Sequence, residues 1–455
     1  MVKRHRSLAL FAMLALLYIA AGIWTTRQVA PTGDEPYYLL AADALVHGEG
    51  FALDERWSQI ASSGYDPGDH LADLPRQSSP SLRAPGHFPL HDLGLSFLLA
   101  LPFAIGGRSL AVACVGVAMA AAVALAHRTG SRLVSPRAAI AGALLGGLSV
   151  PALTYSGQLF PDSVMALATA AGIAALVGAA PLWAGAVGIA ALPFLHLRGW
   201  PLAIALLVAL GWGRTWRERA MLVAPLFAVV IGSSLVDLAV YGVGLPHAGF
   251  LLFFTARGDT SVVAYATTTP FGFLGLFVDR AFGLLPAAPI ALLAFVGAGV
   301  AIRRRVALPA LVVPYLLLAS ALDWTGGLSP QARYLAPLIP LLVVFLSLGV
   351  AARPWRLAVI ALVPLTAAMS AAYVAVPGIR YDSFGIPPFV DRTFDKALGG
   401  HLSGIYPLLG TDGATGLLLI VWAAVLALAV VPGSRRRAVT PLSSSPGTMT
   451  GGAEH

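Results

Sequence analysis

Long continuous runs of apolar residues, separated by short polar segments, dominate the chain from end to end. Most of these runs are about 17–25 residues long, the length of an α-helix that crosses a hydrocarbon core of ~30 Å. Strands of a membrane β-barrel instead alternate over about ten residues, so the continuous runs exclude a barrel. The pattern therefore predicts an all-α polytopic membrane protein.

Arginine and lysine gather in six short clusters between the apolar runs. The positive-inside rule places such clusters on the cytoplasmic side of a membrane, and one set of twelve spans puts all six clusters and both termini there. The clusters are Lys3/Arg4/Arg6, Arg128/Arg132/Arg137, Arg214/Arg217/Arg219, Arg303/Arg304/Arg305, Arg353/Arg356 and Arg435/Arg436/Arg437. The predicted spans are residues 7–26, 109–127, 138–156, 162–179, 181–196, 200–213, 220–241, 284–302, 306–322, 335–351, 357–375 and 414–432.

The apolar stretch 92–107 would reverse the orientation of everything after it if it crossed the membrane. Pro102 interrupts it, and about 16 residues are marginal for a span. We therefore predict an interfacial or re-entrant helix on the outer side.

The longest segment without a predicted span is the first outer loop, residues 27–108. Its mixture of polar and aromatic residues predicts short interfacial helices. Residues 242–283 and 376–413 form two further outer segments. We predict one transmembrane domain over residues 1–437, followed by a disordered cytoplasmic tail at 438–455, which is small and polar.

Composition agrees with this class of protein. Of the 455 residues, 58% are hydrophobic and 11% are charged, against roughly 25% charged in soluble domains. The net charge of +8 would suit nucleic acid, but the positive residues lie beside the spans, so we predict no nucleic-acid partner. Cys114 is the single cysteine, which excludes an intramolecular disulfide. The absence of CxxC and HExxH motifs leaves no metal motif in the sequence.

Charged and aromatic residues recur at the predicted outer ends of the helices. All of them would face one compartment at about one depth, so they can share a pocket. These residues are Asp34, Glu35, Asp162, His196, Arg198, Asp279, Arg280, Asp323, Trp324, Arg333 and Tyr334.

Each of these residues also has a structural explanation. Asp34 and Glu35, followed by proline, suit the start of a helix. Asp162 follows a proline and can cap the next helix. His196 and Arg198 can reach the interface from the ends of spans.

The later candidates carry similar alternatives. Arg333 and Tyr334 suit an interfacial anchor, and Asp279 and Arg280 can neutralise each other. Asp237 lies inside a predicted span, where ionisable residues tend to be functional, although it can also pair with a neighbouring tyrosine or reach water.

Carboxylates, arginine and histidine at one depth suit the chemistry of lipid-linked phosphosugars. A carboxylate can act as general base toward a hydroxyl acceptor. Arginine and histidine can hold a phosphate whose negative charge grows as it departs. The lipid tail of such a donor lies in the bilayer, and its phosphate and sugar lie at the interface.

Several stretches, in this order, resemble the GT-C superfamily of glycosyltransferases that use polyprenyl-phosphate sugars, which includes protein O-mannosyltransferases and bacterial aminoarabinose transferases. "GDEPYYLLAADAL" is similar to the acidic motif that opens the family's first outer loop. "RAPGHFPLHDLGLSFLLA" is similar to its proline element, and "QLFPDSVMALATA" to its second acidic motif. "GLFVDRAFGLLPAAP" and "WTGGLSPQARYLAPLIPLL" resemble later stretches of prokaryotic members. The resemblance covers most of residues 7–375.

The resemblance implies roles for individual residues. Asp34 would be the catalytic base, and Glu35 would support it or help to bind a metal or the acceptor. Asp162 would be the second acidic residue of the site. The implied substrate-binding residues are Asp162, His196, Arg198, Arg333, Tyr334, Arg83 and His87. The proline element departs from the family's double proline at Arg83–His87, which puts the role of His87 in doubt.

These expectations combine into one functional hypothesis with two alternatives. We expect a GT-C-like bundle that transfers a sugar, with inversion, from a polyprenyl-phosphate donor to a glycan, lipid or protein acceptor. The active site would face the outside of the cytoplasmic membrane. Two carboxylates can hold Mg²⁺ or Mn²⁺, although family members without a metal exist. A transporter or lipid flippase, and a structural assembly subunit, are the alternatives.

Overall fold

The computed structural model describes residues 2–63, 78–256, 269–321, 329–352, 356–377, 405–407, 409 and 415–431, and these residues are almost entirely helical. The helices up to residue 211 are α1 (Val2–Gln28), α2 (Glu35–Val46), α3 (Asp54–Ser63), α4 (Leu93–Leu133), α5 (Pro136–Gly147), α6 (Val150–Tyr155), α7 (Asp162–Leu176), α8 (Leu182–Leu195) and α9 (Gly199–Gly211). The later helices are α10 (Trp216–Tyr241), α11 (Ala248–Ala256), α13 (Thr269–Val278), α14 (Leu284–Ala287), η2 (Pro289–Ala291), α15 (Leu292–Arg303), α16 (Leu308–Ala321), η3 (Arg333–Leu338), α17 (Ile339–Ala351), α18 (Arg356–Ala375) and α19 (Thr415–Val430).

The described residues contain two very short strands, β1 (Ser78–Ser79) and β2 (Phe88–Pro89), which pair antiparallel.

Four described helical stretches are long and apolar enough to cross a membrane. They are His5–Gln28, Leu93–Leu133, Trp216–Tyr241 and Arg333–Ala351, and seven further apolar helices have 10–17 residues. Helix is present in each of the twelve predicted spans. An all-helical chain with the apolar helices of a membrane protein is thus confirmed, while the number of crossings stays a prediction.

Prolines interrupt two of the predicted spans. The span at 138–156 is divided into α5 and α6, with Pro151 in the first turn of α6. The span at 284–302 is divided into α14, η2 and α15, with Pro289 at the start of η2. Proline has no backbone N–H to donate, so it begins a helix more readily than it continues one.

Helix α4 joins the predicted interfacial helix at 92–107 to the span that follows it. It has 41 residues, but the backbone leaves the helical conformation at Gly106 and Gly107, where Gly107 has φ 58° and ψ −156°. Such a conformation is essentially restricted to glycine. The predicted boundary between the two segments therefore lies at the break in α4.

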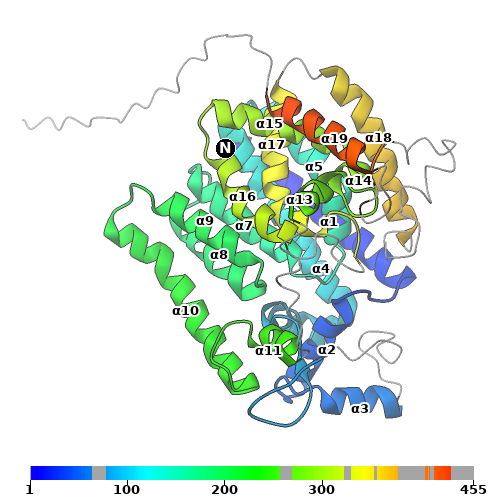
Figure 1. Ribbon diagram of the computed structural model, residues 1–455, viewed down its shortest axis with the longest axis vertical. Coiled ribbons are helices and arrows are strands. Elements are labelled where there is room, and N and C mark those ends of the chain that lie inside the picture. Colours follow the sequence, from blue (N-terminus) through cyan, green and yellow to red (C-terminus); the bar gives the residue numbers. More distant parts are fainter. Residues whose placement is uncertain are drawn as a thin grey trace, which may run out of the picture.

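The segment 27–108, predicted to be an outer loop, contains packed helices in its described part. Figure 1 shows α2, α3 and α11 gathered at one end of the molecule, beside the C-terminal end of α10. Tyr37, Trp57, Phe88 and Tyr241 belong to one buried cluster that ties these segments together. The loop is thus fixed against the helical body, in which α4 packs against α1 and α7, and α17 against α15 and α5.

Several predictions lie outside the described residues. They concern the tail at 438–455, the outer segment over 378–404, and the side chains of Asp323 and Trp324.

Candidate functional site

Asp34 stands where α2 begins, at the N-cap position. Its side chain makes no capping hydrogen bond, so helix capping does not account for it. Its Oδ2 instead accepts a hydrogen bond from Nη2 of Arg333, and its Oδ1 lies 3.8 Å from Nε2 of His91. The carboxylate therefore faces a guanidinium from a segment far along the chain.

Arg333 begins the 3-10 helix η3. The preceding residue, Ala332, has φ 59° and donates its backbone N–H to the carbonyl of Phe282 at 2.9 Å, which fixes the start of η3. The guanidinium carbon of Arg333 lies 4.2 Å from the centre of the Phe160 ring, and its Nε lies 3.9 Å from Oδ2 of Asp162. Arg333 thus lies between the two acidic residues that the resemblance singled out.

Asp162 and Arg198 complete this group of charges. Asp162 is the first residue of α7, and its side chain is fully buried. Its Oδ1 lies 3.5 Å from Nη1 of Arg198, whose guanidinium stacks 4.1 Å above the ring of Tyr334. Within the described residues, no hydrogen bond of ordinary geometry reaches either oxygen of Asp162 or either terminal nitrogen of Arg198. We call Asp34, Arg333, Asp162 and Arg198 the ion network.

A second polar group lies next to the ion network. His196 accepts a hydrogen bond on Nδ1 from the backbone N–H of Arg198, at 3.1 Å. The same Nδ1 lies 3.6 Å from Oδ2 of Asp92. His247 Nδ1 lies 2.6 Å from Oδ1 of Asp92, and the indole N–H of Trp200 donates to His247 Nε2 at 3.1 Å. Because indole is only a donor, the neutral ring of His247 carries its proton on Nδ1 and donates it to Asp92.

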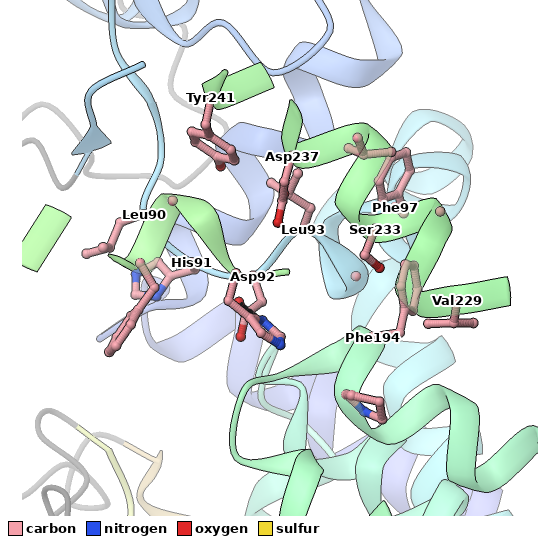
Figure 2. A pocket seen from close by; sticks show the side chains of 17 residues that line it. Leu90, His91, Asp92, Leu93, Phe97, Phe194, Val229, Ser233, Asp237 and Tyr241 are labelled. Atoms are coloured by element: carbon pink, nitrogen blue, oxygen red, sulfur yellow. Dashed lines mark hydrogen bonds and ion pairs between the residues drawn. The ribbon is translucent and has the colours of Figure 1, made fainter. Parts of the chain in front are cut away.

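His91 connects these two groups. Its ring packs at 5.2 Å, between centroids, from that of Tyr38, and it lines a cavity of about 380 Å³ that Asp92 and His247 also line. Figure 2 shows His91 and Asp92 at this cavity, together with Asp237 from α10. His91 is thus in contact range of Asp34 and also faces the cavity.

Burial and neighbouring charges set the protonation of the site. Burial opposes ionisation of Asp34, but the positive charge of Arg333 holds the pKa of Asp34 well below its usual value. Burial also lowers the pKa of His91. The carboxylate of Asp34 is therefore ionised near pH 7, and burial favours the neutral form of His91.

Glu35 is fully buried and binds backbone. Its Oε1 accepts from the N–H of Leu159 at 2.6 Å, and its Oε2 accepts from the N–H of Thr32 at 3.1 Å. Glu35 thus attaches the start of α2 to the segment that leads into Asp162.

Arg83 and His87 are not brought to the ion network. Arg83 is exposed, and His87 pairs through Nδ1 with Oδ1 of Asp54 at 2.6 Å, on the surface. Asp237 accepts a hydrogen bond from the backbone N–H of Ala248 at 3.2 Å. Arg83 and His87, which the resemblance implied as substrate-binding residues, thus lie away from the ion network.

Asp279 ties two segments of backbone together. It accepts hydrogen bonds from the N–H groups of Ala281, Phe282 and Leu409 at 2.8–2.9 Å. Its burial raises its pKa to about 6.

Asp92 and His247 are site residues that the sequence did not reveal. Asp92 was hidden because it precedes an apolar helix and so suits an N-cap, although its side chain makes no capping bond. His247 has φ 68°, a conformation that sequence patterns do not indicate outside glycine. Their position at the same predicted depth as the other polar residues is the signal that could have found them.

The donor atoms of the ion network do not suit a divalent cation. Asp34 and Asp162 each lie against a guanidinium, and these positive charges would repel a second cation. Among the described residues, no three histidine, cysteine, aspartate or glutamate side chains gather as metal ligands.

In comparison with known proteins, no protein-family model matches the chain, and no curated protein matches it.

Proposed function

We propose that the protein is a membrane glycosyltransferase that moves a sugar from a polyprenyl-phosphate donor to an acceptor. The observation that carries this proposal is the ion network, in which residues 34, 162, 198 and 333 meet from four separate segments. Two guanidiniums suit a phosphate, and a neighbouring carboxylate suits proton transfer. The glycosyltransferase hypothesis requires such a meeting, since a shared substrate cannot bridge distant residues.

The proposed reaction is a single displacement. The acceptor oxygen forms a bond to the anomeric carbon of the sugar, while the bond from that carbon to the phosphate oxygen breaks, so the configuration inverts. The leaving phosphate gains one negative charge, which Arg198 and Arg333 stabilise. The acceptor's proton passes to Asp34.

Arg198 is the better first contact for the donor phosphate. Its terminal nitrogens make no ordinary hydrogen bond within the described chain, although Nη1 lies 3.5 Å from Oδ1 of Asp162, and the flat face of the guanidinium stacks on Tyr334. A planar guanidinium presents its donors along its edge.

Arg333 links donor binding to the strength of the base. While it pairs with Asp34, the carboxylate has little affinity for a proton. A bound phosphate competes for Arg333, and a weakened Asp34–Arg333 pair raises the pKa of Asp34. Asp34 therefore becomes an effective base only when the donor is present.

Twelve crossings and a site on the outer face of the cytoplasmic membrane belong to this proposal. They rest on the clustering of arginine between the apolar runs and on the positive-inside rule. The resemblance to the GT-C superfamily supports the same arrangement.

The direct test is to incubate the purified protein with a panel of polyprenyl-phosphate sugars and to measure release of the lipid phosphate. Asp34→Asn should lower kcat/KM by ~10²–10⁴, and Arg198→Gln by ~10²–10³. Glu218→Gln, a matched change at a partly exposed carboxylate of α10 outside the ion network, should leave the rate unchanged. Near-normal transfer by Asp34→Asn would remove Asp34 as the base, and no release from any donor would overturn the proposal.

A lipid flippase is the second candidate, because helices are interrupted between α5 and α6 and between α14 and α15. Interrupted helices are common in transporters. In liposomes that contain a fluorescent lipid, the protein should not accelerate movement of that lipid between leaflets. Accelerated movement without sugar transfer would favour the flippase.

A further inference from the structure

The cavity beside the ion network differs from it in charge. It has a volume of about 380 Å³, within the range of roughly 300–1,000 Å³ typical of sites for small molecules. Its walls are the start of α4, the end of α8, the middle of α10 and the start of α11.

Most of the cavity wall is apolar. Figure 2 shows the polar side chains of His91, Asp92 and Asp237 among the residues that line it. Phe97, Phe194 and Val229 are among the apolar lining residues, and Asp92, Asp237, His91 and His247 are among the polar ones. Among the residues that the structure describes, no arginine or lysine lines it. The cavity can thus surround an apolar chain and bind a neutral or cationic polar group, while its two carboxylates repel an anion.

Helix α10 separates this cavity from the apolar surroundings of the protein. Phe227, Ile231 and Leu235 on α10 are exposed, as expected for a side that faces lipid. Gly232 lines the cavity, and a Cβ atom placed there would meet no atom within 4 Å. An apolar chain can therefore be held directly behind a lipid-facing helix.

We propose that this cavity binds the acceptor, and that the acceptor is a lipid whose head carries a hydroxyl group and no phosphate. This inference rests on the proposed sugar transfer at the ion network. The donor phosphate belongs with Arg198 and Arg333, which do not line the cavity. An acceptor hydroxyl near His91 lies beside Asp34, since His91 Nε2 is 3.8 Å from that carboxylate.

Two photoreactive probes with the same apolar chain test this proposal: a diazirine-bearing prenol and its phosphate monoester. Each is irradiated with the full-length protein in nanodiscs, and labelled peptides are identified by mass spectrometry. The prenol should label the 229–237 stretch of α10, and the phosphate should label it at least about tenfold less, because of the repulsion. Equal or stronger labelling by the phosphate would assign the cavity to the donor tail and overturn the proposal, as would no labelling by either probe.

Two variants sharpen the result. Gly232→Trp fills the cavity and should abolish labelling by the prenol, whereas Gly211→Trp, at a glycine outside this cavity that also has open space around it, should not. Asp237→Asn keeps an oxygen to accept the Ala248 hydrogen bond but removes a negative charge, so it should increase labelling by the phosphate. Unchanged discrimination in Asp237→Asn would contradict the charge argument.

The labelling needs no turnover, so it separates this inference from the proposed function. Release of lipid phosphate without prenol labelling would remove only the acceptor assignment. Prenol labelling without release from any donor would remove the sugar transfer.

Discussion

Replacing Asp34 by Asn and Arg333 by Gln, singly and together, measures how strongly the two side chains are coupled. The double-mutant cycle isolates their interaction from the separate effects of each change. The side chain of Arg333 is 7% exposed and that of Asp34 is 22% exposed, so water screens the pair only in part.

The expected coupling is intermediate between surface and fully buried pairs. Two unit charges about 4 Å apart interact by ~4 kcal/mol at an effective dielectric constant of 20, which sets the upper end. Close charge pairs in other cycles give about 1.5 kcal/mol or more. We therefore expect a coupling of about 2–4 kcal/mol between Asp34 and Arg333.

Asp54 and His87 provide a matched control pair in the same protein. Their side chains are 52% and 45% exposed, so the coupling between Asp54→Asn and His87→Gln should be no more than about 1 kcal/mol. Both cycles are measured by equilibrium unfolding in mixed micelles, followed by tryptophan fluorescence at one pH. A coupling at Asp34–Arg333 no larger than that of the control would refute the argument that Arg333 holds Asp34.

Three further changes test the surroundings of the site by the same unfolding measurement. Glu35→Gln leaves one acceptor oxygen for the two backbone N–H groups that Glu35 binds, so the free energy of unfolding should fall by about 1–3 kcal/mol. An unchanged free energy of unfolding would mean that these hydrogen bonds contribute little to stability. Asp279 keeps its proton up to about pH 6 when folded and loses it near pH 4 when unfolded, so its contribution to stability falls by roughly 3 kcal/mol as the pH rises between these values. Asp279→Asn should remove that slope, and an unchanged slope would assign it to other groups. In Gly94→Ala, the added Cβ meets the backbone of Phe194 in α8, so the free energy of unfolding should fall by about 1–3 kcal/mol. Gly211 has open space around it, so the control variant Gly211→Ala should not show this steric destabilisation.

The helices could be predicted from the sequence because the apolar runs leave the backbone few alternatives. In lipid, backbone groups must bond within their own segment, so a continuous apolar run of this length forms a helix. The positions at which the helices are interrupted were harder to predict. Pro151 and Pro289 are visible signals, but a proline near the start of a helix looks the same as one inside it until packing decides. Only at Gly106 and Gly107 did a predicted boundary coincide with an interruption.

For the site, the closeness of these residues was predictable and their pairing was not. Asp34, Asp162, Arg198 and Arg333 were expected to share one level, and the structure brings them into one network. Which guanidinium meets which carboxylate depends on how helices pack, and no local pattern records that. Glu35 illustrates the limit, because its neighbour in sequence binds Arg333 while Glu35 binds the backbone of Leu159.

The sequence separation of 299 between Asp34 and Arg333 also imposes an order on biosynthesis. At about 5–20 residues per second, a ribosome needs roughly 15–60 s to make the intervening chain. Along the chain both carboxylates of the ion network precede both arginines, so a nascent protein carries the negative charges first. A chain released before residue 333 keeps a net negative site, and the later arginine of the ion network is also the one that binds Asp34 at the start of α2.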